Sequence, residues 1–456
     1  MTQVSDHERS AGPTGRIAPD DRPRPDPASR GADAGAAGLA RVVETVLGGD
    51  IPIAVVCYDG SRAGPADAPA TLTVRSADAL RRVLTAPGEL GFGRAYVAGD
   101  LDVEGDIYAA LGLRERFGSI RLSASQWLSL LRLAGASGLR PLPAPPEEAR
   151  LRGRRHSPAR DAAAIAHHYN VSNAFYRLVL GPSMTYSCAV WPTAAATLED
   201  AQAAKYELVC RKLGLGPGMR LLDVGCGWGG MVLHAARHHG VHAVGVTLSA
   251  QQAEWAVRAV SDAGLGDQIE IRLQDYRDVA DGPYDAISSI GMFEHVGLAR
   301  LGEYFARLNQ LLRPGGRLLN HGISRPPGGR PRFSRRGFID RYVFPDGEVH
   351  EIGAVVSRLQ AEGFEVRHVE SLREHYALTL RAWVANLEQG WNDAVADVGA
   401  ARARIWRLYM AGCALNFEAG SAQVHQVLAA PATVGRSEPL RPDWEATPLT
   451  VPASPT

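Results

Sequence analysis

The sequence lacks a long uninterrupted apolar run, so we expect no membrane-spanning helix. A helix needs about 18 or more consecutive apolar residues to cross a bilayer, and no run in the 456-residue chain approaches that length. The opening residues, MTQVSDHERSAGP, contain no apolar signal region either. We therefore expect a cytoplasmic protein.

Cysteine is scarce, and neither sign of charge is in excess. The five cysteines are widely scattered, show no C-x-x-C spacing and have no evident histidine partner for zinc. We expect free thiols in a reducing compartment and no metal site. Lysine plus arginine equals aspartate plus glutamate at 49 each, so bulk charge indicates neither a nucleic-acid partner nor strong attraction to a membrane.

Large apolar residues are nearly missing from residues 1–36, where only Met1, Val4 and Ile17 occur. Such a segment buries too little surface to fold. We predict a disordered tail there and a second disordered tail over residues 431–456.

The following part of the chain predicts a small α+β domain over residues 37–137. A helical pattern, LARVVETVL, precedes two short apolar strands, IPIAVVCY and TLTVRS, and a helix, ADALRRVLTA. A later predicted helix, from Gln126 to Leu133, either touches a membrane surface or packs in the core, and its spacing favours packing.

Residues 138–160 read as a basic, proline-rich linker, because neither helix nor strand tolerates this composition. We place a domain boundary here. The segment is either a solvated spacer or a site of attraction for anionic lipid head groups. Its arginines are Arg150, Arg152, Arg154, Arg155 and Arg160.

Strand and helix patterns alternate from residue 161 to 430. The predicted strands are RLLDVG, HAVGVTL, IEIRLQ, YDAISSIG, RLLNHGI and VRHVESL. This alternation predicts an α/β, doubly wound parallel sheet with helices on both faces. Ligands bind such sheets outside the carboxyl ends of the strands.

A glycine-rich turn, LLDVGCGWGG over residues 221–230, follows the first of these strands. Glycine tolerates positive φ and lets a ligand approach the backbone. Gly225, Gly227 and Gly230 also satisfy the G-x-G-x-x-G pattern of dinucleotide sites, so the turn alone does not identify the cofactor.

The surrounding residues favour S-adenosylmethionine over a dinucleotide. A dinucleotide site usually has an acidic residue at the end of the second strand, but residues 245–249 read GVTLS. Asp223 and Asp275 instead end two other strands, where a carboxylate can meet the amine or sulfonium of S-adenosylmethionine. The alternative is that both aspartates only cap helices or turns.

Eight motifs in the same order resemble the cyclopropane-fatty-acyl-phospholipid synthases and the related mycolic acid cyclopropane synthases. They run from about residue 167 to 428. The stretch GELGFGRAYVAGDLDVEGD also resembles the small N-terminal domain of the phospholipid enzymes. We expect residues 37–137 to form a lipid- or membrane-associated domain, and whether it recruits membrane, pairs subunits or does both stays open. The motifs are HHYNVSNAFYRLVLGPSMTYSCAVW, LLDVGCGWGG, VGVTLSAQQ, LQDYRD, SIGMFEHVG, FIDRYVFPDGE, HYALTLRAW and YMAGCALNFEAGSAQVHQV.

The resemblance implies a Rossmann-like, seven-stranded methyltransferase domain over residues 161–430, with S-adenosylmethionine and bicarbonate as bound groups. Family positions around the cofactor match Tyr186, Ser187, Gly225, Gly227, Thr247, Leu248, Gln252, Asp275 and Tyr276, to which our residue analysis adds Asp223. Those around bicarbonate match Cys188, Ile290, Glu294, His321 and Tyr376. The first two of these are expected to contribute backbone groups, the other three their side chains.

The implied reaction transfers a methylene group from S-adenosylmethionine to the cis double bond of an unsaturated phospholipid acyl chain. Methyl transfer to an alkene leaves a carbocation, and a base such as bicarbonate then removes a proton to close a cyclopropane ring. Aromatic faces, among them Tyr186, Tyr376, Phe175 and Tyr169, are candidates to stabilise the cation. For the last two, packing is the favoured alternative.

Several alternatives remain open from the sequence. The same reactants can give a methylene- or methyl-branched chain. A non-catalytic lipid-binding protein can also retain the fold. A dehydrogenase is disfavoured because residues 245–249 lack the acidic residue of a dinucleotide site. We expect the protein to lie at the inner face of the membrane, with a homodimer as one possibility. The arginine-rich loop of residues 325–336 either contacts lipid phosphate or is solvated.

Overall fold

The computed structural model describes residues 38–47, 49, 51–113, 140–149, 160, 171–328, 337–345, 347–432 and 444. Several predictions lie outside these residues: the tail of residues 1–36, nearly all of the tail of residues 431–456, the helix at 126–133, the arginines at 150–155, Tyr169, and loop residues 329–336. Within the described residues, no helix is long and apolar enough to cross a membrane.

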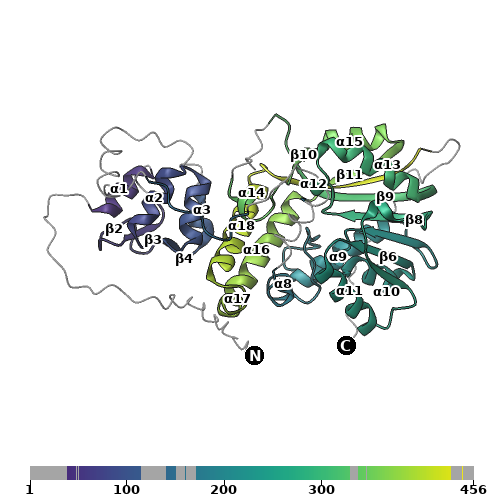
Figure 1. The fold of residues 1–456 in the computed structure, drawn as a ribbon, viewed down its shortest axis with the longest axis horizontal. Coiled ribbons are helices and arrows are strands. Elements are labelled where there is room, and N and C mark those ends of the chain that lie inside the picture. The colour runs from purple at the N-terminus through teal and green to yellow at the C-terminus, as the bar shows by residue number, and fades with distance from the viewer. Residues whose placement is uncertain are drawn as a thin grey trace, which may run out of the picture.

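The N-terminal part forms a four-stranded sheet in the order β2-β1-β3-β4 (Figure 1). β1 and β3 run parallel, and β2 and β4 pair with them antiparallel. The strands are β1 (Ala54–Cys57), β2 (Arg62–Ala63), β3 (Ala70–Val74) and β4 (Leu101–Gly105). The helices are α1 (Leu39–Val46), α2 (Ala77–Thr85), α3 (Glu89–Val97) and α4 (Ile107–Gly112).

The C-terminal part forms a larger sheet with a seven-strand path, β11-β12-β9-β8-β5-β6-β7, and a short β10 beside β9. All strands run in one direction except β12, which is antiparallel to both neighbours. This arrangement confirms the predicted doubly wound α/β sheet. The strands are β5 (Arg220–Val224), β6 (His242–Thr247), β7 (Ile269–Leu273), β8 (Tyr284–Ile290), β9 (Leu312–Arg325), β10 (His350–Glu351), β11 (Phe364–Ser371) and β12 (Gln423–Pro431).

Helices cover both faces of the large sheet (Figure 1). α13 (Leu301–Leu311) and α15 (Ile352–Ala361) pack on one face in one apolar cluster. α9 (Leu198–Leu213), α10 (Gly230–His239) and α11 (Ala250–Asp262) contribute to a separate cluster on the other face. Two apolar layers therefore hold the carboxyl ends of the strands in place.

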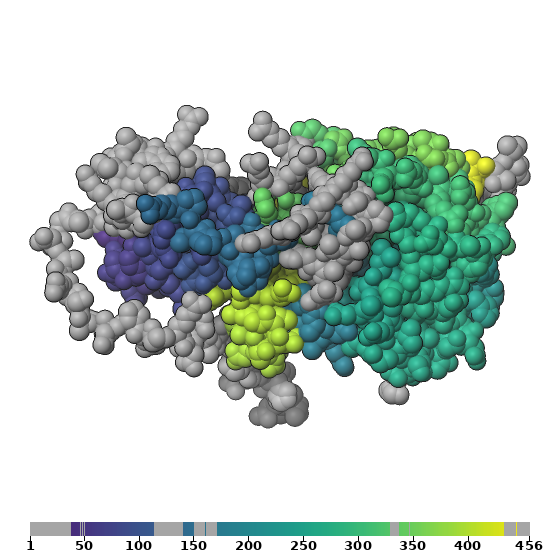
Figure 2. All heavy atoms as spheres, viewed as in Figure 1, coloured from purple at the N-terminus to yellow at the C-terminus, as the bar shows by residue number. Residues whose placement is uncertain are grey.

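A block of helices lies between the two sheets (Figure 1). It contains α8 (Asn173–Leu180), α16 (Arg373–Gln389), α17 (Trp391–Val398) and α18 (Ala400–Glu418). Its buried residues share one apolar cluster with the N-terminal sheet. In the space-filling view the N-terminal part and α17–α18 form one continuous body (Figure 2).

Arg407 of α18 joins this helical block to the N-terminal sheet. Its side chain is buried and donates hydrogen bonds to the carbonyls of Val103 (2.9 Å) and Gly105 (3.1 Å), and to Glu388 (2.7 Å). A buried guanidinium is tolerated because these acceptors satisfy it.

Part of the predicted linker is also anchored. Glu148 is buried and receives two hydrogen bonds of 2.8 Å from Arg94 of α3. Its carboxylate accepts a third, of 3.2 Å, from Tyr342 of α14 (Phe338–Tyr342). The described linker residues therefore pack between the two parts of the chain, while the domain boundary at residues 138–160 stays a prediction.

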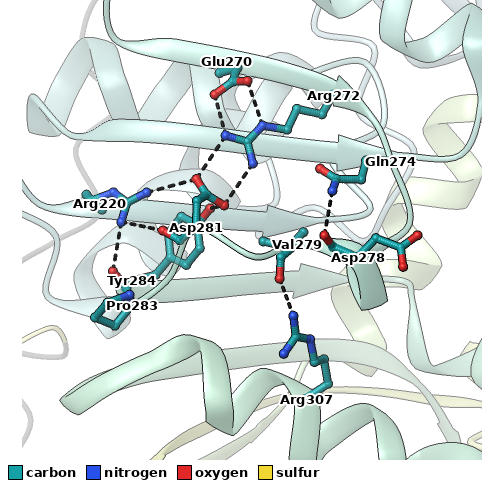
Figure 3. Close-up of polar contacts among 10 residues, drawn as sticks. All are labelled: Arg220, Glu270, Arg272, Gln274, Asp278, Val279, Asp281, Pro283, Tyr284 and Arg307. Atoms are coloured by element: carbon teal, nitrogen blue, oxygen red, sulfur yellow. Dashed lines mark hydrogen bonds and ion pairs between the residues drawn. The ribbon is translucent and has the colours of Figure 1, made fainter.

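A polar network fixes the segment that follows β7 (Figure 3). Arg272 bonds Glu270 and Asp281, and Arg220 bonds Asp281 at 3.1 Å. The amide of Gln274 donates to the carbonyl of Asp278 at 2.9 Å. Each of these partly exposed contacts adds little stability. Together they restrain the segment that follows β7 and contains Gln274, at the carboxyl end of the sheet.

Candidate functional site

The first candidate site is a cavity of about 190 Å³ at the carboxyl ends of β5, β6, β7 and β8. The structure brings all ten residues predicted around the cofactor to its wall. They are Tyr186, Ser187, Asp223, Gly225, Gly227, Thr247, Leu248, Gln252, Asp275 and Tyr276. Their individual roles remain predictions.

The glycine-rich turn forms one wall of this first cavity. Gly225 has φ of +80°, and a Cβ there would lie 2.6 Å from the sulfur of Met292, so only glycine fits. Its amide donates to the carbonyl of Val246 at 2.9 Å. A Cβ on Gly227 would meet no atom within 4 Å, so this position leaves open space beside the cavity.

The two predicted aspartates differ in environment. Asp223 is buried and accepts a 2.6 Å hydrogen bond from Ser288, and burial raises its pKa to about 6. Asp275 caps the 3-10 turn η1 (Tyr276–Asp278) and pairs with Arg277. Burial would raise the pKa of Asp275, but the hydrogen bonds from Arg277 lower it below its usual value. The capping alternative therefore describes Asp275 but not Asp223.

Lys205 of α9 is a charged residue in this cavity that sequence reasoning missed. It is buried, and its ammonium lies 3.5 Å from the centre of the Tyr206 ring. Desolvation lowers its pKa to about 7, although nearby Asp223 acts in the opposite direction. The signal was present: Lys205, Leu208 and Lys212 share the i, i+3, i+7 spacing of an apolar helix face, so both lysines occupy core positions.

A second cavity, of about 330 Å³, adjoins the first. Four of the five residues predicted around bicarbonate line it: Cys188, Glu294, His321 and Tyr376. Ile290 borders the first cavity instead, although it pairs with His321 in the β8–β9 register. Both cavities share Tyr186, Ser187, Gly291 and His295, so a group held in one can reach a group held in the other.

Glu294 lies in α12 (Phe293–Val296), and its two carboxylate oxygens differ in their hydrogen bonding. Oε1 accepts a 2.6 Å hydrogen bond from the amide of Ile323, whereas Oε2 is buried and unpaired among the described residues. Burial raises the pKa of Glu294 to about 7. This carboxyl is therefore poised to gain or lose a proton near neutral pH.

His321, on β9, shows the same asymmetry. Its Nδ1 lies 3.2 Å from the amide nitrogen of Gln426, whereas its Nε2 is buried without a partner among the described residues. Burial, helped by the positive charges of Lys205 and Lys212, lowers its pKa to about 3. His321 is therefore a neutral imidazole.

Cys188 is not placed to act as a nucleophile. Its thiol donates to the carbonyls of Ala189 (3.2 Å) and Leu372 (3.6 Å). Burial raises its pKa well above the usual value, and the thiolate is the reactive form of cysteine.

Aromatic rings line the junction of the two cavities. Tyr186 stacks on Trp383 with ring centroids 5.3 Å apart, and its hydroxyl lies 3.3 Å from that of Tyr409. Tyr376 meets Trp383 edge-on. Phe175 borders neither cavity and packs on Trp406, so its packing alternative is the one observed.

One cysteine lies in a cluster of side chains that could hold a metal ion. The ligand atoms of Cys210, His234 and His239 lie within 4.8 Å of one another, so a cysteine does have histidine neighbours. Sequence spacing hid this cluster because it joins α9 to α10. Glu207 accepts hydrogen bonds from His234 (3.3 Å) and His239 (3.0 Å), which accounts for both histidines without an ion.

Comparison with known proteins shows clear similarity over most of the chain. The family model described as mycolic acid cyclopropane synthetase matches residues 156–427. A protein of Mycobacterium tuberculosis named probable fatty acid methyltransferase is 49% identical over 421 residues, which is 89% of this chain and 98% of that protein. The cyclopropane-fatty-acyl-phospholipid synthase of Escherichia coli K12 is 34% identical over 372 residues, covering 81% and 90%.

Solved structures share the large sheet and its helices. The cyclopropane synthase MmaA2 from Mycobacterium tuberculosis has a TM-score of 0.57 and 35% identity, over 59% of this chain and 98% of its own. The mycolic acid cyclopropane synthase CmaA1, complexed with SAH and CTAB, has a TM-score of 0.56 and 37% identity over the same shares.

Proposed function

The chain belongs to the mycolic acid cyclopropane synthetase family, and from this membership we propose its reaction. It is an S-adenosylmethionine-dependent methyltransferase that modifies lipid acyl chains, as the resemblance implied. The proposed reaction adds a methylene group to the cis double bond of an unsaturated phospholipid acyl chain and closes a cyclopropane ring.

The observation that carries this proposal is the junction of the two cavities. The first cavity is lined by the glycine-rich turn together with Asp223 and Lys205, whereas the second places aromatic rings beside the carboxyl of Glu294 and the imidazole of His321. An alkene is a poor nucleophile, so its reaction with a methyl donor depends on holding both partners close and aligned. The shared wall at Tyr186 and Gly291 suits that requirement.

The residues of the first cavity fit S-adenosylmethionine, which supplies an electrophilic methyl group when bound. Open space beside Gly227 leaves room for a ligand close to the backbone. The amino-acid end of the cofactor carries one charge of each sign. Asp223 and Lys205 offer the complementary pair of charges on the wall of the same cavity.

Bicarbonate fits the second cavity by its hydrogen-bonding groups. The ion has one O–H donor and several acceptor oxygens. When ionised, Oε2 of Glu294 accepts from that O–H, while Nε2 of His321 and the hydroxyl of Tyr376 donate to the oxygens. When bound, the ion would supply a base for ring closure. We propose that Glu294 receives the proton released there, because its pKa of about 7 suits proton exchange.

The aromatic wall serves the positive charge that develops on the acyl chain. The faces of Tyr186 and Tyr376 attract a cation through the ring quadrupole. A cavity lined by such rings also excludes water, which would otherwise trap the cation as an alcohol. Cys188 and Ile290 complete the surroundings of the ion and the cofactor without reacting.

The proposed substrate places the protein at the inner membrane surface. Acyl chains lie within the bilayer, so the enzyme must meet them there, and we assign this contact to the N-terminal part and the adjoining basic segments. A homodimer remains an expectation from the sequence.

A second product deserves a test because of one comparison. The relative at 49% identity is named a probable fatty acid methyltransferase rather than a cyclopropane synthase. Loss of a proton from a neighbouring chain carbon, instead of from the added methyl, gives a methylene branch from the same reactants.

Product analysis separates these outcomes. Purified protein is incubated with S-adenosylmethionine, bicarbonate and oleoyl phospholipid vesicles, and the released acyl chains are examined by mass spectrometry and proton NMR. We expect a gain of one methylene with cyclopropane protons. Vinylidene protons would establish the branched product instead, and acyl chains without added carbon would contradict both.

A further inference from the structure

We propose that Lys212 and Gln426 are positioning residues that hold His321 with its proton on Nε2, directed at the anion in the second cavity. The buried contacts Lys212–Gln426–His321 carry this inference, which rests on the proposed function for the identity of the anion. Neither Lys212 nor Gln426 borders either cavity, so both act through the histidine.

The three side chains form a continuous buried row. The ammonium of Lys212 lies 2.7 Å from Oε1 of Gln426, and Nε2 of that amide lies 3.2 Å from Nδ1 of His321. Lys212 and Gln426 have no exposed surface, and His321 is 2% exposed. The outer end of the row is Glu370, which also contacts Lys212.

Hydrogen-bond chemistry allows one arrangement of protons along this row. An ammonium group only donates, so the amide must turn its oxygen toward Lys212. The amide nitrogen, which also only donates, then faces Nδ1 of His321. Nδ1 must accept, and a neutral imidazole that accepts at Nδ1 carries its proton on Nε2.

The strand register places the amide beside the histidine. Gln426 of β12 and His321 of β9 are direct partners across the antiparallel ladder. A shift of one residue would turn every side chain of β12 to the opposite face. The sheet therefore fixes the position of Gln426. The hydrogen bond from Lys212 then determines which way its side-chain amide is rotated.

Burying the ammonium of Lys212 calls for a reason beyond stability. Replacing a buried ion pair with apolar residues of similar volume is often neutral or stabilising, and Lys212 occupies a fully buried position of α9. Its charge orients the amide and also disfavours a second positive charge on His321. Both effects keep a neutral donor facing the cavity.

The substitution Gln426→Glu tests the proposal with almost no change in shape. A carboxylate still accepts from Lys212, but it can only accept from His321, so the imidazole proton moves to Nδ1 and Nε2 loses its donor role. Removing one donor of this kind typically lowers kcat by about 10²–10³-fold. We expect a loss of about 10²-fold with unchanged affinity for S-adenosylhomocysteine, because the cofactor cavity is untouched.

Two further variants separate positioning from folding. Lys212→Met keeps the length of the side chain but frees the amide to turn, so we expect mixed tautomers and a loss of roughly tenfold in kcat. Glu370→Gln retains an oxygen acceptor for Lys212, so this matched control should keep turnover within about twofold of the unaltered enzyme.

The decisive readout is the tautomer itself, measured by long-range proton–nitrogen NMR on histidine-labelled protein, with His321 assigned by its loss in His321→Gln. We expect the His321 proton on Nε2 in the unaltered enzyme and on Nδ1 in Gln426→Glu. A proton on Nδ1 in the unaltered enzyme, or full turnover by Gln426→Glu, would overturn the proposal. Failure of the unaltered enzyme to modify acyl chains would contradict the proposed function, while the spectra would still decide the tautomer.

Discussion

Buried ionisable side chains define the chemistry of this protein at the scale of single residues. Glu294, His321 and Lys205 each have a pKa displaced toward the neutral form by burial. Such displacement is costly to folding and is concentrated at functional sites. Two of these groups yield predictions that a purely structural role would not produce.

Glu294→Gln should lower kcat by about 10²-fold or more, because an amide holds the anion but cannot take a proton from it. In the unaltered enzyme, kcat should rise with pH through about 7, as the carboxyl ionises. The variant should show no such rise. Rates measured between pH 6 and 8.5 check both statements, and a variant with the parental pH profile would remove Glu294 from the proton path.

The same substitution affects stability with a defined sign. The pKa of Glu294 is higher in the folded protein than its ordinary value of 4.5, so ionisation destabilises the folded state as pH rises from about 4.5 to 7. Thermal melting at pH 5 and pH 8 should therefore show Glu294→Gln gaining stability relative to the unaltered protein at the higher pH.

Lys205→Met should weaken binding of S-adenosylhomocysteine by about tenfold, the loss expected for one charge-assisted contact with its carboxylate. The related ligand 5′-methylthioadenosine has no amino-acid end and serves as the control, with an affinity that should not change. Calorimetric titration measures both. Equal weakening of the two ligands would show that Lys205 supports the cavity rather than the carboxylate.

At the scale of elements, the glycine-rich turn between β5 and α10 does not accommodate a side chain at Gly225. Gly225 combines a φ of +80° with a close approach to Met292. Strain and steric overlap therefore act at the same position, and both would displace the wall of the cofactor cavity.

Gly225→Ala should reduce affinity for S-adenosylhomocysteine at least tenfold, because a φ of +80° strains alanine and its Cβ displaces the Met292 side chain in the cavity wall. Gly266→Ala is the matched control: a Cβ there meets no atom within 4 Å, and the residue lacks positive φ. Binding assays and melting curves on both variants decide the matter. Normal binding by Gly225→Ala would mean that the turn adapts without cost.

Helices and strands were predicted well where the hydrophobic periodicity agreed with the glycine and proline residues that end an element. They were predicted poorly elsewhere. The strand β5, its glycine turn and the helix α9, which ends at Gly214 in the left-handed conformation, follow local rules. The helix α3 carries Gly91 and Gly93, which obscured its period. Both are needed for close packing, since a Cβ on Gly93 would lie 2.3 Å from Phe338.

Site residues likewise fall into those that sequence patterns predicted and those that only the folded structure revealed. Nine of the ten cofactor-side positions were predicted from family motifs and Asp223 from its place at the end of a strand, and all ten gather at one cavity. Lys205, Lys212 and Gln426 were not predicted, because their importance depends on which way a side chain turns in the folded core. The helical spacing of the two lysines indicates a buried face, but it does not show which groups their charges contact.

At the scale of the whole molecule, the N-terminal sheet and the helical block share one core, and Arg407 lies at their contact. The guanidinium satisfies carbonyl groups at the end of β4 as well as Glu388. Removing it takes a hydrogen-bond donor away from each of these acceptors, of which Val103 is buried.

Arg407→Met should destabilise the protein by about 1–3 kcal/mol, the typical cost of leaving a buried hydrogen-bonding group without its partner. Calorimetry should show an earlier transition, with the N-terminal part separating from the rest. Arg402→Met, on the same helix but half-buried, should change the transition little. A single unshifted transition for Arg407→Met would show that apolar packing alone joins the two parts.

The antiparallel strand β12 has a consequence for synthesis of the protein. It fills the gap between β9 and β11, yet it is made after both of them and after three intervening helices. Until residue 431 leaves the ribosome, β9 presents an unpaired edge rich in buried-type residues, a feature that invites aggregation. His321 also lacks its amide partner until then, so the proposed arrangement of the site cannot be complete before β12 has been synthesised.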